Sequence, residues 1–157
     1  MCMHEGMSLA PWGALGSGYF KPEEQIHNNG GRNLAPMKSK AAEQVSEALE
    51  KIAKRKSTLI TSVALAYVMH KTPYVISICG GRKVEHLRGN IEALGLQLDD
   101  ADMDEIEGAY DFDVAFPYNM ISSGPNAAKG PEDHVSSKRL GHFDYVKGPR
   151  PIPPHVD

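Results

Sequence analysis

The stretch YVISICGGRKVEHLRGN, Tyr74 to Asn90, changes its pattern twice. YVISIC is a nearly continuous apolar run with Tyr, Val and Ile, which is typical of a strand buried on both faces, as in a parallel sheet. Two glycines and two cations follow, and the spacing then becomes helical from Val84 to Leu94, with Gly95 as a natural stop. The apolar side of this helix consists of Leu87, Ile91 and Leu94. The stretch therefore predicts a strand, a turn and a helix of an α/β fold.

The turn in this unit is suited to a phosphate group. Gly80 and Gly81 let the backbone approach an anion, and free N–H groups at the start of a helix point toward it. Arg82 and Lys83 add positive charge at the helix end where the dipole already favours an anion, and a planar guanidinium suits a phosphate monoester. The same residues are also compatible with an ordinary solvated turn.

Two polar residues follow on the same helix. His86 lies three residues after Lys83, and Asn90 lies four residues further on, so both can share a face within the first turns. An imidazole and a carboxamide could hydrogen-bond a purine or a ribose, because both offer donors and acceptors. The alternative is that both residues are solvated helix positions. A metal at His86 is not indicated, because no second ligand lies at the helical spacing.

A second glycine-rich loop occurs near the N-terminus. Met7 to Phe20 reads as a short strand followed by WGALGSG, where Gly13, Gly16 and Gly18 would permit a tight wrap around a pyrophosphate. The spacing is neither the GxGxxG fingerprint nor a P-loop. Trp12 precedes this loop as either a core residue or a stacking platform. Two phosphate-competent turns after successive strands favour a (β/α)8 barrel, whose phosphate site is typically built from the loops after strands 7 and 8.

Helical patterns fill much of the remaining chain. One begins near Ser39, a second spans Thr61 to His70, and a third begins after Asp99, which can serve as its N-cap, with Asp102 in the first turn. The residues expected to face the core are Val45, Leu49, Ile52, Ala53, Val63, Ala64, Tyr67, Val68, Met103 and Ile106.

Two segments lack such a pattern. KPEEQIHNNGGRNLAPMK, Lys21 to Lys38, reads as a surface loop. After Asp111 the periodicity fails, and PRPIPP should be extended, polyproline-like chain. We expect a partial barrel over residues 1–110 and an irregular segment over 111–157, either partly docked or flexible.

Composition gives few further constraints. The 157 residues carry a net charge of −3, so there is no general reason to expect nucleic acid or an anionic membrane as a partner. Two cysteines are too few for a disulfide framework, which favours a reducing compartment, and Cys79 is expected to be a small buried residue rather than a nucleophile. No signal peptide or membrane span is recognisable, so we expect a cytoplasmic protein.

The motifs quoted above resemble those of the aldo-keto reductase family, and within it the fungal aryl-alcohol dehydrogenase and norsolorinic acid reductase branch. HEGMSLAPWGALGSGYF is similar to the seventh strand and its loop, and GGRKVEHLRGNIEALGLQLDDADMDEIE is similar to the eighth unit and the following helix. FDVAFPYNM and GHFDYVKGPRPI resemble its C-terminal segment. The resemblance implies an α/β fold that is the C-terminal portion of a TIM (β/α)8 barrel, with strands 7 and 8.

The resemblance also implies a cofactor and its binding residues. The family binds NADP(H) and moves a hydride between nicotinamide and an aldehyde, ketone or alcohol. By position, Trp12 lies against the nicotinamide, the loop from Gly13 to Gly18 crosses the pyrophosphate, and Arg82 and Lys83 meet the 2′-phosphate. The cofactor-binding residues implied are Trp12, Gly13, Leu15, Gly16, Gly18, Gly80, Gly81, Arg82, Lys83, His86 and Asn90.

The catalytic Asp, Tyr, Lys and His of the family have no match in this sequence. We therefore expect a truncated oxidoreductase that holds the cofactor-binding part and is inactive alone. The alternative is a non-catalytic nucleotide-binding or interaction remnant. Because barrels remove strand edges only by closing, we also expect self-association or pairing with a complementary N-terminal half.

Overall fold

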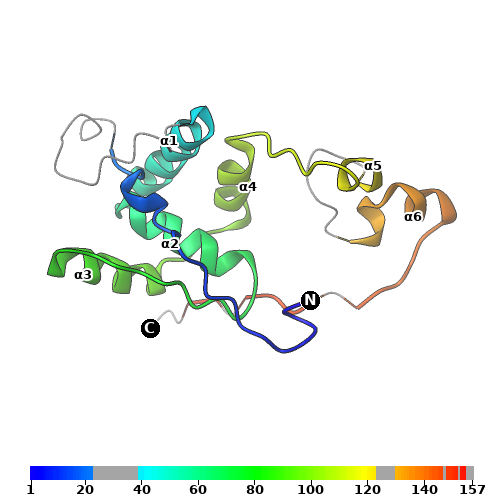
Figure 1. Ribbon diagram of the computed structural model, residues 1–157, viewed down its shortest axis with the longest axis horizontal. Helices are drawn as coiled ribbons and strands as arrows, with labels where there is room; N and C mark the ends of the chain where they lie inside the picture. The colour runs from blue at the N-terminus through cyan, green and yellow to red at the C-terminus, as the bar shows by residue number, and fades with distance from the viewer. Residues whose placement is uncertain (23–38, 123–129, 147, 152, 155–157) are drawn as a thin grey trace. The chain divides into compact units, whose positions relative to one another are not determined.

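The computed structural model describes residues 1–22, 39–122, 130–146, 148–151 and 153–154 (Figure 1). The chain divides into two compact units, one made of Met1–Ala109 with Pro149–Asp157 and the other of Tyr110–Gly148. Most of the surface loop predicted at Lys21 to Lys38 lies outside the described residues.

Three helices build the core of the first unit: α1 (Lys40–Arg55), α2 (Ile60–Lys71) and α4 (Asp100–Gly108). Their buried side chains form one cluster with Leu98, and α2 is central because it buries residues over most of its first half. The helical pattern thus predicted these elements correctly. The cluster consists of Leu49, Ile52, Ala53, Ile60, Val63, Ala64, Ala66, Leu98 and Ile106, with Val45, Tyr67 and Met103 packed against it.

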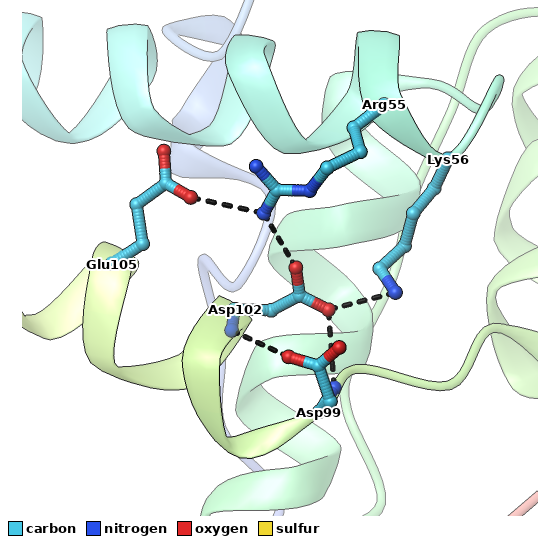
Figure 2. Close-up of polar contacts among 5 residues, drawn as sticks. All are labelled: Arg55, Lys56, Asp99, Asp102 and Glu105. Carbon is cyan, nitrogen blue, oxygen red and sulfur yellow. Dashed lines mark hydrogen bonds and ion pairs between the residues drawn. The ribbon is translucent and has the colours of Figure 1, made fainter.

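A buried carboxylate joins the end of α1 to the start of α4 (Figure 2). Asp102 is 1% exposed, and its two carboxylate oxygens lie 2.6 Å from Arg55 Nη2 and 2.7 Å from Lys56 Nζ. Its backbone N–H donates to Asp99 Oδ1, and the Asp99 N–H donates back to Asp102 Oδ2, which completes a capping box. Burial alone raises the pKa of Asp102, but the hydrogen bonds from Lys56 and Arg55 outweigh it and lower the pKa to about 2.

The two predicted strands occur as extended segments that pair only locally. Parallel bridges join Leu9 to Val75 and Trp12 to Ile78, and no longer strand is formed within the described residues. Three backbone hydrogen bonds support the pairing: from Leu9 N–H to Tyr74 O (2.9 Å), from Ile76 N–H to Leu9 O (2.8 Å) and from Ile78 N–H to Pro11 O (3.0 Å). We call these paired segments, residues 8–12 and 74–78, the parallel ladder.

The prediction that YVISIC is buried on both faces was wrong. Val75 and Ser77 are half-buried, whereas Tyr74, Ile76 and Ile78 are exposed, so exposure alternates along the segment. The physical reason is that side chains of alternate residues point to opposite faces, and only the face that carries Val75 meets α2, across a groove that both line. Cys79, expected to be buried, is exposed because it lies beyond the last bridge of the ladder, where the chain turns toward Gly80.

Helix α3 (Val84–Glu92) follows the ladder and passes into a 3₁₀ turn, η4 (Ala93–Gly95). Its apolar side chains Leu87, Ile91 and Leu94 are all more than half exposed, so their shared side is not a core face here. The contact with α2 instead uses Gly89, which is buried and whose carbonyl accepts a 3.0 Å hydrogen bond from Ser62 Oγ. A Cβ on Gly89 would lie 2.8 Å from Leu59 Cδ1, so a residue without a side chain allows the two helices to approach closely.

The second unit contains short helices where an irregular segment was expected. These are α5 (Tyr118–Ile121), η5 (Pro131–Asp133) and α6 (Val135–Leu140), and an antiparallel bridge joins Ser122 to His134. Tyr145 packs close to Gly130, where an added Cβ would lie 2.5 Å from the tyrosine hydroxyl. Over the described parts of both units, no helix has the length and apolar character needed to cross a membrane.

Candidate functional site

The parallel ladder brings the two glycine-containing loops to the same end of two neighbouring segments. The paired residues are three positions apart on both segments, so the register is constant from the first bridge to the second. Because the segments run in the same direction, the loop after Trp12 and the turn after Ile78 both leave from their carboxyl ends (Figure 1). Ligands of α/β proteins bind at this end of parallel strands. The two predicted phosphate turns therefore follow the carboxyl ends of two paired segments.

The first loop is tightly folded and depends on glycine conformations. Gly13, Gly16 and Gly18 have φ values of 82°, 63° and 88°, in the left-handed region that other residues rarely adopt. Gly16 also begins the 3₁₀ turn η1 (Gly16–Gly18), and its N–H donates to Gly13 O at 2.9 Å. A Cβ at Gly16 would lie 2.8 Å from the ring of Phe20, which itself packs against the core cluster. The loop is therefore anchored to the helical core, and half-buried Leu15 precedes η1 as its N-cap residue.

Trp12 lies at the start of this loop with 78% of its surface exposed. Trp12 therefore lies outside the core cluster of this unit. Its bridge partner, Ile78, is 53% exposed. An exposed indole beside a glycine loop is an available platform for a planar ring.

The second turn presents cations at the beginning of α3. Gly80, Gly81, Arg82 and Lys83 are all exposed, and Lys83 is the N-cap residue with extended backbone and no capping hydrogen bond from its side chain. The N–H groups of the first turn are thus not satisfied by a side-chain cap, which is the arrangement that binds anions at helix N-termini. Glu85 is the one acidic residue in this first turn.

His86 folds back over the glycine turn. A Cβ added to Gly81 would lie 2.7 Å from His86 Cβ and 3.2 Å from its Nδ1, so Gly81 is required for the imidazole to lie there. Asn90 follows on the same helix face one turn later and is half-buried. Sequence reasoning assigned both residues to the site but missed the contact between His86 and Gly81, since no sequence spacing indicates it.

Cys79 is adjacent to the turn and is a free, exposed cysteine. Partial burial of its sulfur raises the pKa of the thiol, so the protonated form is favoured at neutral pH. The expectation that Cys79 is not a nucleophile stays a prediction, since the burial on which it was based is not found.

An apolar groove lies on the face of the parallel ladder that carries Leu9 and Val75, opposite the face of Trp12. It has a volume of about 380 Å³, lies between the ladder and the C-terminal half of α2, and has Lys71 as its one charged lining residue. Lys71 forms an ion pair with Glu107 and lies over the ring of Tyr67. None of the predicted cofactor-binding residues lines this groove. Its lining residues are Leu9, Ala10, Pro11, Tyr67, Val68, Lys71, Thr72 and Val75.

The fold resembles that of a solved barrel oxidoreductase. A thermostable aldo-keto reductase, Tm1743, crystallised with the inhibitor epalrestat, matches with a TM-score of 0.50 and 24% sequence identity over 69% of this chain and 32% of that one. This likeness concerns the fold alone.

The chain belongs to the aldo/keto reductase family, because the model of that family matches residues 1–111. It is 46% identical to the aryl-alcohol dehydrogenase GME11368 of Pestalotiopsis microspora, over 99% of this chain and 40% of that protein. It is 46% identical to norsolorinic acid reductase B of Dothistroma septosporum (98% and 42%) and 37% identical to an aryl-alcohol dehydrogenase [NADP(+)] of Phanerodontia chrysosporium (98% and 41%). The chain thus spans about two fifths of the length of these relatives, and the resemblance inferred from its motifs is confirmed.

Proposed function

We propose that this chain holds the nucleotide of NADP(H) in an oxidoreductase that interconverts alcohols with aldehydes or ketones. The observation that supports the proposal is the constant register of the parallel ladder, because the Trp12 loop and the Gly80–Lys83 turn both continue from its carboxyl end. The family membership supports the choice of cofactor, as does the name of the Phanerodontia relative, an aryl-alcohol dehydrogenase [NADP(+)].

The roles within the site follow from its chemistry. Arg82 and Lys83 offer charge-assisted hydrogen bonds to the 2′-phosphate, where a bidentate guanidinium adds specificity to charge. The uncapped N–H groups of α3 act on the same phosphate. His86 and Asn90 supply donors and acceptors to the adenosine.

The Trp12 loop serves the other end of the cofactor. Its three left-handed glycines bring backbone close to the pyrophosphate, and the exposed indole of Trp12 stacks against the nicotinamide. When bound, the nicotinamide supplies or accepts the hydride. These residues bind and orient the cofactor, and we assign the proton donor to none of the tyrosines of this chain.

Cofactor discrimination tests this proposal. The double variant Arg82→Ala/Lys83→Ala removes both charges that meet the 2′-phosphate, so we expect NADPH affinity to fall at least about tenfold, the effect of one charge-assisted hydrogen bond or more. The affinity for NADH, which lacks this phosphate, should fall by less than about twofold in the same variant. Isothermal titration of both nucleotides against the 157-residue chain measures the difference.

Arg88→Ala is the matched control, because Arg88 is an exposed arginine of α3 outside the proposed contacts. It should leave NADPH affinity within about twofold of the parent chain. Equal losses for NADPH and NADH in the double variant, or no NADPH binding by the parent chain, would contradict the proposal. Steady-state turnover of an aromatic aldehyde by this chain alone would contradict the separate expectation that it binds without catalysing.

A further inference from the structure

The residues that precede the parallel ladder are rich in sulfur. MCMHEGM, residues 1–7, contains one cysteine, one histidine and three of the seven methionines of the chain. We call this segment the sulfur turn. Thiolate and thioether ligands select Cu(I) among the metals that proteins bind, and imidazole also suits copper. The proposed nucleotide site uses none of these residues, so their clustering needs another explanation.

The backbone of the sulfur turn is folded back on itself, as the dark-blue loop at the start of the chain shows (Figure 1). The N–H of His4 donates to Met1 O at 2.9 Å, and the N–H of Met7 donates to Cys2 O at 2.9 Å. The second bond joins two residues that both carry sulfur. The turn therefore brings donors from its two ends close together.

The donor side chains are accessible to an ion. Met3 and Met7 are 41% and 44% exposed, His4 is exposed, and Cys2 is a free, half-buried cysteine. None of these four residues belongs to the core cluster. A methionine side chain has three rotatable bonds, so its sulfur can adjust to an ion that the Cys2 thiol holds. The sulfur turn thus combines an entry path with adjustable ligands.

The available ligands favour a soft ion over a hard or borderline one. Among the described residues, His, Cys, Asp and Glu form no group of three that could hold a metal ion. Structural Zn²⁺ and Ca²⁺ sites are built from such groups. A site in the sulfur turn therefore depends on thioether sulfur, which is a ligand for Cu(I).

We propose that the sulfur turn binds one Cu(I) ion through Cys2 Sγ and the thioethers of Met3 and Met7, with the imidazole of His4 as a further ligand. The Cys2 thiol releases its proton to solvent when the sulfur binds the metal. The turn precedes Leu9 and so lies at the amino end of the ladder, whereas both glycine loops leave from the carboxyl end. The metal site is separate from the proposed nucleotide site.

Titration of the 157-residue chain with Cu(I) tests the inference. Oxygen is excluded, and the chelator bicinchoninate competes for the ion and reports its free concentration by colour. We expect the chain to take one equivalent of Cu(I) from the chelator and to gain ultraviolet absorption from thiolate-to-copper charge transfer. An equal concentration of Zn²⁺ should not displace the bound ion, because Zn²⁺ binds thioethers poorly.

Substitutions identify the ligands. Cys2→Ser should lower Cu(I) affinity at least about tenfold, since even the loss of an outer partner of a metal ligand costs this much. Met3→Leu/Met7→Leu removes sulfur with little change of volume and should also cost at least about tenfold. The matched controls are Cys79→Ser, at the other free cysteine, and Met120→Leu, at a 69% exposed methionine of the second unit. Both controls should stay within about twofold of the parent chain.

Any of four results would overturn the inference: no Cu(I) taken from the chelator, full affinity in either sulfur variant, an equal loss in Cys79→Ser, or two chains per ion by light scattering. The sulfur turn lies outside the helices, so circular dichroism of every variant should match that of the parent chain. None of these readouts involves a nucleotide, and failure here is distinguishable from failure of the proposed cofactor site.

Discussion

At the level of single residues, glycine has a different role in each of the two loops. In the first loop glycine is needed for left-handed backbone, whereas Gly81 is needed because the side chain of His86 occupies the space of a Cβ. Both roles were expected only in a general form, as close approach of backbone to an anion. The sequence showed where the glycines occur. The reason for a glycine at position 81 is the position of His86, five residues further on, which only the structure shows.

Exchange of Gly81 for alanine tests this packing. Gly81→Ala places a methyl group 2.7 Å from His86 Cβ, so the start of α3 must shift, and we expect NADPH affinity to fall by about tenfold, as for other overpacked sites. A Cβ at Gly80 would have no neighbouring atom within 4 Å, so Gly80→Ala should lower NADPH affinity by less than about threefold. Titration of each variant with NADPH gives both numbers. Equal losses would mean that the nucleotide, and not His86, excludes a side chain at this turn.

At the level of elements, the helices were predictable because their signal is local. The apolar spacing of Leu49, Ile52 and Ala53 and the cap at Asp99 both lie within a few residues of the helix that they define. The contact between Arg55 and Asp102 joins residues far apart in the sequence, and a single sequence contains no signal that pairs them. For the same reason the alternating exposure of Tyr74 to Ile78 was not predicted, since it depends on which face another element covers.

The ion pairs of Asp102 between α1 and α4 should make the free energy of unfolding depend on pH. The pKa of Asp102 is about 2 in the folded chain, below the value of about 3.9 for an unperturbed Asp, so ionised Asp102 favours folding. This contribution is present above about pH 4 and is lost as the pH falls toward 2. Because Arg55 is half in solvent, we expect Asp102→Asn to lower the free energy of unfolding at pH 7 by about 1–2 kcal/mol.

Urea unfolding of Asp102→Asn at a series of pH values measures this contribution. Asp104→Asn is the control, since Asp104 is an exposed residue of the same helix, and it should change the free energy of unfolding by less than about 0.5 kcal/mol. The difference between the two variants should shrink as the pH approaches 2. A difference that stays constant from pH 7 to pH 2 would show that Asp102 acts through packing and not through its charge.

At the level of the whole molecule, the chain has one tryptophan, and it lies in the first unit. Trp12 is exposed, so its fluorescence should have the long-wavelength emission and easy quenching by acrylamide that are typical of an indole in water. Binding of NADPH should quench this emission, because the proposed site stacks the nicotinamide on the ring. Emission typical of a buried indole in the free chain would contradict the exposed position, and unchanged emission at saturating NADPH would contradict the stacking.

The sequence showed a loss of periodicity after Asp111, and the two compact units of the structure meet between Ala109 and Tyr110. The return of Pro149–Asp157 to the first unit has no signal in the sequence. The short helices α5 and α6 were not predicted, because elements of four and six residues are too short to show a repeat of apolar residues.

The junction of Arg82 and Lys83 has a consequence for how the chain breaks. It is an exposed peptide outside the helices, with the side chains that trypsin recognises, and it separates α1 and α2 from α4 in the sequence. The core cluster and the buried Asp102 hold these same helices together in space. A protease can therefore cleave the backbone at this turn while the two fragments stay associated as a nicked protein. A dinucleotide bound as proposed would shield that peptide from cleavage.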